Sequence, residues 1–112
     1  MDYTMREIGE ELHSLISVGK NSINKFKEEF DKDPYHTILW TDIRTIVASV
    51  EAYEYLVVLL HKSESMETFT KGCAHLCRYK AAKLDKESTK QNKMNTAQTQ
   101  CYNSFYLDYL NN

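Results

Sequence analysis

Residues 39–60, LWTDIRTIVASVEAYEYLVVLL, carry apolar side chains at spacings that alternate between four and three without a break. This spacing gathers the side chains into one stripe along an α-helix, as at the a and d positions of a coiled coil. The stripe consists of Leu39, Ile43, Ile46, Val50, Tyr53, Val57 and Leu60. The segment therefore predicts a long helix that packs along one side against other helices.

The sequence before this segment predicts one more helix. Thr4 and Glu7 form a capping box, and Tyr3 and Ile8 are placed for the hydrophobic staple that accompanies it. Apolar residues then recur at helical spacing until about Phe30, interrupted only by glycine 19. Asp33-Pro34 follows, an N-cap residue and a proline suited to the first position of the next helix.

The sequence after residue 60 predicts two further helices. Ser63 or Ser65 caps the third helix, and Ser88 with Gln91 caps a fourth that runs to about Leu110. The third helix has its own apolar stripe, made of Phe69, Cys73, Leu76, Cys77 and Leu84. Neither glycine nor proline separates the two helices at 85–88, so one long rod is an alternative to the hairpin that we favour.

The composition agrees with an all-α fold. The 112 residues include only three glycines and one proline, too few for the frequent turns of a β-sandwich or barrel. With 42% hydrophobic and 27% charged residues, the chain is typical of globular proteins. We predict a single domain over 1–112, an antiparallel up-down bundle of about four helices, each about 20 to 28 residues long.

Targeting and redox signals point to the cytoplasm. The N-terminus has neither the basic nor the apolar region of a secretory signal, and the longest apolar run, Leu56–Leu60, is far too short to span a bilayer. Three cysteines are an odd number, which does not suit a secreted disulfide framework. We expect a cytoplasmic protein with reduced thiols and no membrane partner.

The stretch KGCAHLCR at residues 71–78 raises the question of a metal site. Cys73 and Cys77 are four apart and share a helix face, whereas His75 lies about 200° round the helix from Cys73. A tetrahedral site would need Cys101 and a fourth ligand from elsewhere. We interpret the cysteines as core thiols and His75 as exposed, and predict no metal and no cofactor. A hairpin turning near Lys86 would make Cys73 and Cys101 neighbours.

Arg6 and His13 lie on the first predicted helix with six residues between them. This spacing resembles the R-x4-6-H motif of HEPN-type ribonucleases, which are small helical bundles. In that family the arginine and histidine of a dimer assemble to cleave RNA, and the motif lies late in the chain, whereas here it lies at the start. The resemblance implies a ribonuclease, in which changes to Arg6 or His13 should abolish RNA cleavage.

Charge is divided unevenly along the chain. Residues 1–70 carry 7 basic and 13 acidic side chains, whereas residues 71–93 carry 7 basic and 2 acidic ones. The candidate partner-binding residues in this basic run are Lys71, Arg78, Lys80, Lys83 and Lys86. They suit an acidic protein surface better than nucleic acid, because the run contains one arginine only. A solvated face, or pairing with the acidic first helix within the bundle, are the alternatives.

The C-terminus carries an aromatic stripe, whose members are Tyr102, Phe105, Tyr106 and Tyr109. Leu107 and Leu110 lie on other sides of the same helix, and a helix that is apolar on several faces needs several neighbours. Residues 90–100 offer the bundle only Met94 and Ala97, so we expect this half of the helix to be held weakly. The stripe is therefore predicted to form the interface of a homodimer, with simple capping of the core as the alternative.

These observations favour a protein that works by binding. No glycine-rich phosphate loop, C-x-x-C pair or Ser/His/Asp set is present, so we predict that the chain is not an enzyme. The leading hypothesis is a small inhibitor or adaptor that occludes a macromolecular partner as a homo-oligomer. Its lysine-rich, arginine-poor composition suits AT-rich bacterial, phage or viral genes. The second hypothesis is a nucleic-acid or nucleotide-binding bundle that uses the basic third helix, and the third is the HEPN-like ribonuclease.

Overall fold

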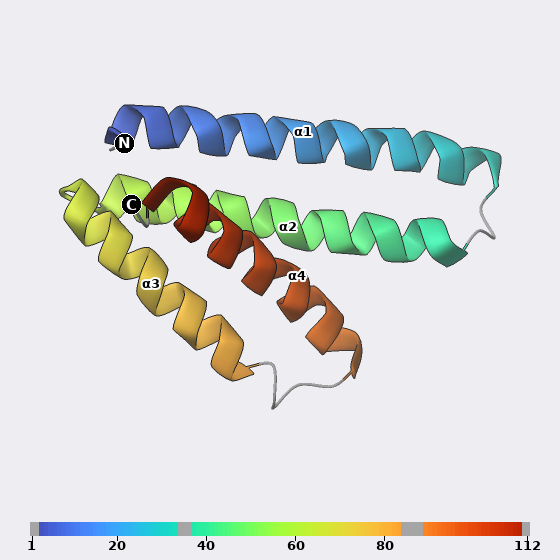
Figure 1. The fold of residues 1–112 in the computed structure, drawn as a ribbon. Coiled ribbons are helices and arrows are strands. Elements are labelled where there is room, and N and C mark those ends of the chain that lie inside the picture. The colour runs from blue at the N-terminus through green and yellow to red at the C-terminus, as the bar shows by residue number, and fades with distance from the viewer. Residues whose placement is uncertain (1–2, 34–36, 84–88, 111–112) are drawn as a thin grey trace.

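The computed structural model describes residues 3–33, 37–83 and 89–110, with side chains for 3–33, 42–83 and 94–110. These residues form an all-α bundle of four helices (Figure 1). The helices are α1 (Met5–Lys32), α2 (Thr37–Lys62), α3 (Met66–Lys83) and α4 (Thr89–Phe105), and α4 continues into a π-helical turn, η1 (Tyr106–Leu110). The predicted fold class is therefore confirmed.

Local capping explains where the helices begin and end. Thr4 is the N-cap of α1: its hydroxyl accepts a hydrogen bond from the amide of Glu7, 3.2 Å, while the Glu7 carboxylate accepts one from the Thr4 amide, 3.1 Å. Ser65 caps α3 in the same way by accepting from the amide of Thr68. Both predicted caps are thus confirmed. Asp33 closes α1 by donating its amide to the carbonyl of Glu29. The predicted helix start at Pro34 and the predicted cap at Ser88 lie outside the described residues.

The helices pair as two hairpins (Figure 1). α1 and α2 run antiparallel over most of their length, and α4 crosses the other side of α2. α3 packs mainly on α4 and touches α2 only near the short connection between them, so the two helices diverge from that point. α3 and α4 are separate helices that run in opposite directions, which excludes the single rod. The described part of α3 has 18 residues, and α4 with its π-helical turn reaches Leu110, where the fourth helix was predicted to end.

One hydrophobic core joins all four helices. It contains Ile8 and Leu12 of α1, Leu56 of α2, Phe69 of α3 and Phe105 of α4, all nearly inaccessible to solvent. α2 buries more than its predicted stripe, because Ala48, Ala52 and Leu56 are also buried on a second side. A helix buried on two sides lies between two neighbours. The small side chains of Ala48 and Ala52 leave room for α4 to cross there.

The polar half of α4 is buried more deeply than its sequence indicates. Asn95 and Thr99 are only 3% and 6% exposed, although both carry polar side chains. The Nδ2 of Asn95 and the Oγ1 of Thr99 have no hydrogen-bond partner. Burying an unpaired polar group costs free energy, about 1 to 3 kcal/mol. The expectation that only Met94 and Ala97 would meet the bundle here was therefore wrong, whereas weak attachment of this half of the helix stays a prediction.

Within the described residues, no helix is both long enough and apolar enough to cross a membrane.

Candidate functional site

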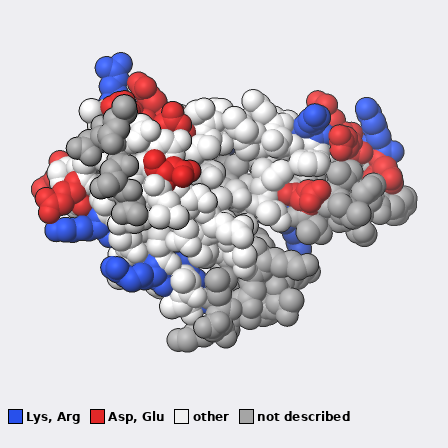
Figure 2. Space-filling view, in the orientation of Figure 1, with Lys and Arg blue, Asp and Glu red and all other residues white. Residues whose placement is uncertain are grey.

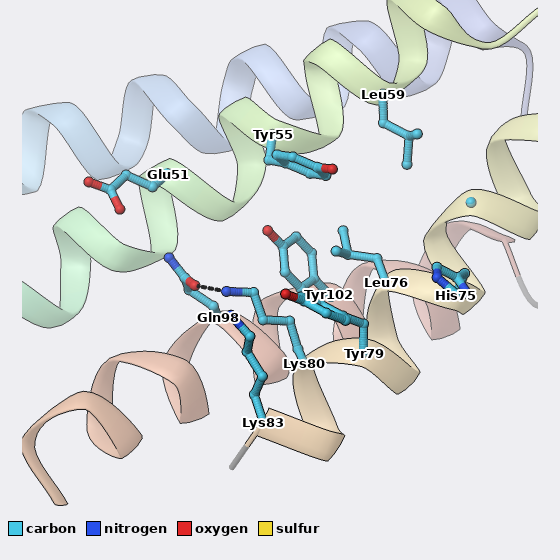
Figure 3. Close-up of a pocket in the computed structure, with 11 residues that line it drawn as sticks. Glu51, Tyr55, Leu59, His75, Leu76, Tyr79, Lys80, Lys83, Gln98 and Tyr102 are labelled. Atoms are coloured by element: carbon cyan, nitrogen blue, oxygen red, sulfur yellow. Dashed lines mark hydrogen bonds between the residues drawn. The ribbon is translucent and has the colours of Figure 1, made fainter. Parts of the chain in front are cut away.

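A groove of about 710 Å³ lies where α3 diverges from α2, and α4 forms its floor (Figure 3). This volume falls within the range of small-molecule and peptide-anchor sites, about 300 to 1,000 Å³. The lining residues come from three helices: Glu51, Tyr55 and Leu59 from α2; Gly72, His75, Leu76, Tyr79, Lys80 and Lys83 from α3; and Gln98 and Tyr102 from α4. It combines tyrosine rings, leucine side chains and two lysines in one concave surface.

Gln98 holds one cationic side of the groove in place. Its Oε1 accepts a hydrogen bond of 2.6 Å from the Nζ of Lys80, and its Nε2 donates one of 3.1 Å to the carbonyl oxygen of Ala48. One side chain of α4 thereby links α3 to α2. Because the Lys80 ammonium is half-buried and bonded to a neutral amide, its charge is not cancelled by a carboxylate at that bond.

Tyrosines form the opposite side and the floor of the groove. Tyr55 and Tyr79 are both about half exposed, and Figure 3 shows Tyr55 projecting from α2 towards the side chains of α3 and α4. The Nζ of Lys83 lies 5.0 Å from the centre of the Tyr79 ring, a cation–π contact. Tyr102 lies beneath and is buried, and this burial raises the pKa of its hydroxyl above the ordinary value, so Tyr102 is neutral at physiological pH.

The predicted basic residues divide between two surfaces. Lys80 and Lys83 line the groove, whereas Arg78 lines a hollow of about 370 Å³ on another side of α3, with Tyr106 and Leu107. Lys71 is exposed and forms a salt bridge of 3.1 Å with Glu67 of its own helix. Lys86 lies outside the described residues. Blue side chains in Figure 2 occur in separate groups on that face.

Among the described side chains of the basic run, Lys71 and Lys80 form their polar contacts away from the acidic first helix. α1 lies across α2 from α3 and α4 (Figure 1). The described contacts of Lys71 and Lys80 are to Glu67 and Gln98, on α3 and α4. The positive charge of the third helix is therefore directed to its own side of the bundle.

The aromatic stripe at the C-terminus is covered mostly by the chain itself. Tyr102 and Phe105 are 4% and 2% exposed, so these two predicted interface residues belong to the core. The centre of the Tyr109 ring lies 4.8 Å from that of Phe105 and 5.2 Å from that of Tyr3, which it meets edge-on. The Tyr109 hydroxyl donates a hydrogen bond of 3.0 Å to Oε2 of Glu11. The prediction that Tyr102 and Phe105 lie at a homodimer interface is wrong, because α1 and α2 already supply the neighbours that the stripe needs.

What remains exposed at the C-terminus is smaller. Leu107 is largely exposed, and it lines the Arg78 hollow together with the half-buried Tyr106. The homodimer stays a prediction; within the aromatic stripe, Tyr106 and Tyr109 are partly exposed, whereas Tyr102 and Phe105 are buried.

The cysteines behave as core thiols. Cys73 is buried, and burial, with a smaller contribution from Cys77, raises the pKa of its thiol from 9.0 to about 12. His75 is exposed on the edge of the groove, as predicted. Cys101 packs against the same core as Cys73 and Tyr53, while direct contact between Cys73 and Cys101 stays a prediction. In the part of the chain that is described, no three His, Cys, Asp or Glu side chains are arranged to hold a metal ion.

Arg6 and His13 line a third hollow, of about 390 Å³, between α1 and the end of α2. His61 lines it as well, so two imidazoles and one guanidinium share one surface. Arg6 is strongly exposed, and its Nε donates to Glu10 at 3.3 Å, which partly neutralises it. The ribonuclease hypothesis therefore gains a third basic side chain that the spacing of the motif did not indicate.

Sequence reasoning singled out the lysines of the groove but did not single out Tyr55, Tyr79 or Gln98, which fall outside the predicted apolar stripes. One signal was present: large aromatic side chains off a helix's buried stripe cost solubility, and they often mark a binding surface. Comparisons of the chain with models of known protein families, with curated proteins and with solved structures give no match.

Proposed function

We propose that this protein is a non-enzymatic binding module that docks an acidic protein partner in the groove between α2, α3 and α4. By occluding that partner it would act as a small inhibitor or adaptor. One observation carries the proposal: Lys80, Lys83 and the exposed rings of Tyr55 and Tyr79 meet in a single concave surface. Aromatic side chains with a few fixed charges are the composition of protein interfaces.

The balance of charge in the groove favours a carboxylate-bearing partner. Among the described residues that line the groove, Lys80 and Lys83 carry positive charge and Glu51, which stands on the α2 side, carries negative charge. Complementary charge steers association and selects among partners.

The three free thiols support a reducing compartment, and with it the proposed cytoplasmic location.

A nucleotide or single-stranded nucleic acid is the second candidate, because tyrosine rings beside lysines can stack bases and bind phosphates. Two features of the groove weigh against it. The Lys83 ammonium already lies over the Tyr79 ring, where a base would stack. The groove is also lined by lysines and not by arginine, which binds phosphate in two-pronged geometry.

Site-specific photo-crosslinking tests the proposal. A photoreactive phenylalanine derivative at Tyr55 or Tyr79 should capture a protein partner in cells, whereas the same group at Val18, an exposed residue of α1, should not. The double change Lys80→Glu and Lys83→Glu should abolish capture. Lys71→Glu, in the same helix but outside the groove, serves as the matched control and should leave capture intact.

The result distinguishes the two candidates. A product that a nuclease shortens, and a complex that weakens steeply as salt rises, would establish nucleic acid and overturn the protein-binding proposal. Capture that is equal at Val18 and in the groove would show that α2, α3 and α4 do not form the binding surface.

The homodimer is proposed separately, through the Leu107 and Tyr106 surface. Leu107→Glu should then shift the protein to a monomer in sizing with light scattering. If the unmodified protein is already monomeric at high micromolar concentration, the dimer is wrong.

A further inference from the structure

The walls of the groove are two helical rows that run along its length. On α2 the row is Glu51, Tyr55 and Leu59, spaced by four, and on α3 it is Gly72, Leu76, Tyr79 and Lys83, spaced by four, three and four. Rows of this spacing are the ridges that neighbouring helices use when they pack, and the space between two such rows accepts the ridge of a third helix. The shape is therefore that of a site for a helix.

The length of the rows sets the length of the segment that fits. At about 1.5 Å per residue, Glu51 to Leu59 spans about 12 Å and Gly72 to Lys83 about 16 Å. A guest helix would contact the groove over two to three turns, and its anchor residues would recur at i, i+3 or i+4, and i+7. An extended segment would find no strand edge to pair with, because the described residues form helices only.

Chemistry changes from one end of the groove to the other. Leu59 and Leu76 lie at the end near the α2–α3 connection, where the walls converge, and Gly72 lies close to the Leu59 side chain. Lys80 and Lys83 lie at the open end, with Gln98 between them and α2. Side chains of a bound partner that enter the closed end must therefore be apolar. Hydrogen-bond acceptors of the partner at the open end would face two ammonium groups.

We propose that the partner inserts an amphipathic helix, with its apolar residues at the closed end and its carboxylates, in its C-terminal turn, on Lys80 and Lys83. The negative end of a helix dipole adds to the attraction of the carboxylates for these lysines, which sets the direction of the guest. This inference rests on the proposed function, because it specifies which part of a protein partner the groove binds. Of the described residues that line the groove, Glu51 carries the same charge as the acidic turn, so it weakens binding of that turn.

Synthetic peptides test the helix and its direction. The probe is a hydrocarbon-stapled peptide of four turns with leucines at i, i+4 and i+7 and three glutamates in the last turn. One comparator carries the glutamates in the first turn, a second replaces them with lysine, and a third contains a central proline and no staple. Binding is measured by fluorescence anisotropy, and its location by NMR shifts of Leu59, Leu76 and Tyr79.

We expect a definite order of affinities. The probe should bind more tightly than all three comparators, and the NMR shift changes should be confined to residues of the groove. Lys80→Glu with Lys83→Glu should weaken it by about tenfold and Glu51→Gln should tighten it a few-fold, while Lys71→Glu should change it less than about twofold. The lysine comparator should bind the doubly changed protein better than the unmodified one.

Other outcomes overturn the inference. Equal binding of the proline comparator would exclude a helix, equal binding of the reversed comparator would exclude the direction, and no binding by any peptide would reject both. Failure of the proposed function has a different signature, because crosslinks from Tyr79 would then capture nucleic acid or no macromolecule. If they capture a protein through an extended segment, the function stands and the helical guest is wrong.

Discussion

Replacing glycine by alanine at two positions of α1 tests how closely α1 and α2 pack. Gly9 and Gly19 both face α2 within the same helix, but their surroundings differ. A Cβ at Gly9 would lie 3.5 Å from the Leu60 side chain, an ordinary contact. A Cβ at Gly19 would overlap Cγ2 of Val50, a buried, β-branched side chain with little rotamer freedom. The two substitutions should therefore differ in their effects on stability.

The magnitudes follow from two opposing contributions. Alanine is favoured over glycine inside a helix by about 1 kcal/mol, and this gain applies at both positions. Overpacking a core costs about 1 to 3 kcal/mol, and this cost applies only at Gly19. Gly9→Ala should raise the free energy of unfolding by about 1 kcal/mol, whereas Gly19→Ala should leave it unchanged or lower it by about 2 kcal/mol.

Urea denaturation followed by circular dichroism measures both effects. A double-mutant cycle with Val50→Ala isolates the contact: Val50→Ala should rescue Gly19→Ala, with a coupling energy of about 1 to 2 kcal/mol, and should be additive with Gly9→Ala. If Gly19→Ala stabilises as much as Gly9→Ala, or couples to Val50 by less than about 0.5 kcal/mol, the close approach of the two helices at this point is refuted.

Three further predictions concern the core and the C-terminus. Thr99→Val removes an unpaired buried hydroxyl and should raise the free energy of unfolding by about 1 kcal/mol in urea denaturation. The same change at the exposed Thr96 should have little effect. A lower free energy of unfolding for Thr99→Val would mean that the Thr99 hydroxyl is hydrogen-bonded. Tyr109→Phe keeps the ring contacts but loses the hydrogen bond to Glu11, so stability should fall by about 1 kcal/mol and show coupling to Glu11→Ala; additive losses would contradict that bond. The pKa of the Cys73 thiol is raised from 9.0 to about 12, so between these values the folded chain holds a proton that the unfolded chain has released. The contribution of this thiol to stability should therefore be complete below pH 9 and fall between pH 9 and about 12. Cys73→Ala should flatten this slope, and an unchanged slope would exclude the thiol as its source.

The candidate site could be predicted only in part. The basic run identified Lys80 and Lys83, because clustered charge is visible in a sequence without any knowledge of contacts. Tyr55 and Gln98 could not be assigned to the same site, since they belong to different helices and their approach depends on the angle at which α4 crosses α2. A helix that contributes one residue to a groove leaves no local pattern that reveals it.

Helix formation itself was determined by the sequence alone, because caps and apolar periodicity act over three to seven residues. Thr4 with Glu7 and Ser65 begin helices where predicted, and the stripe of residues 39–60 packs against the bundle along its described length. Only the tertiary structure decided what covers each helix face. It buried Asn95 and Tyr102, which the sequence had left to solvent or to a second copy, because burial depends on the volume that neighbouring helices leave, and small side chains on α2 let α4 come close.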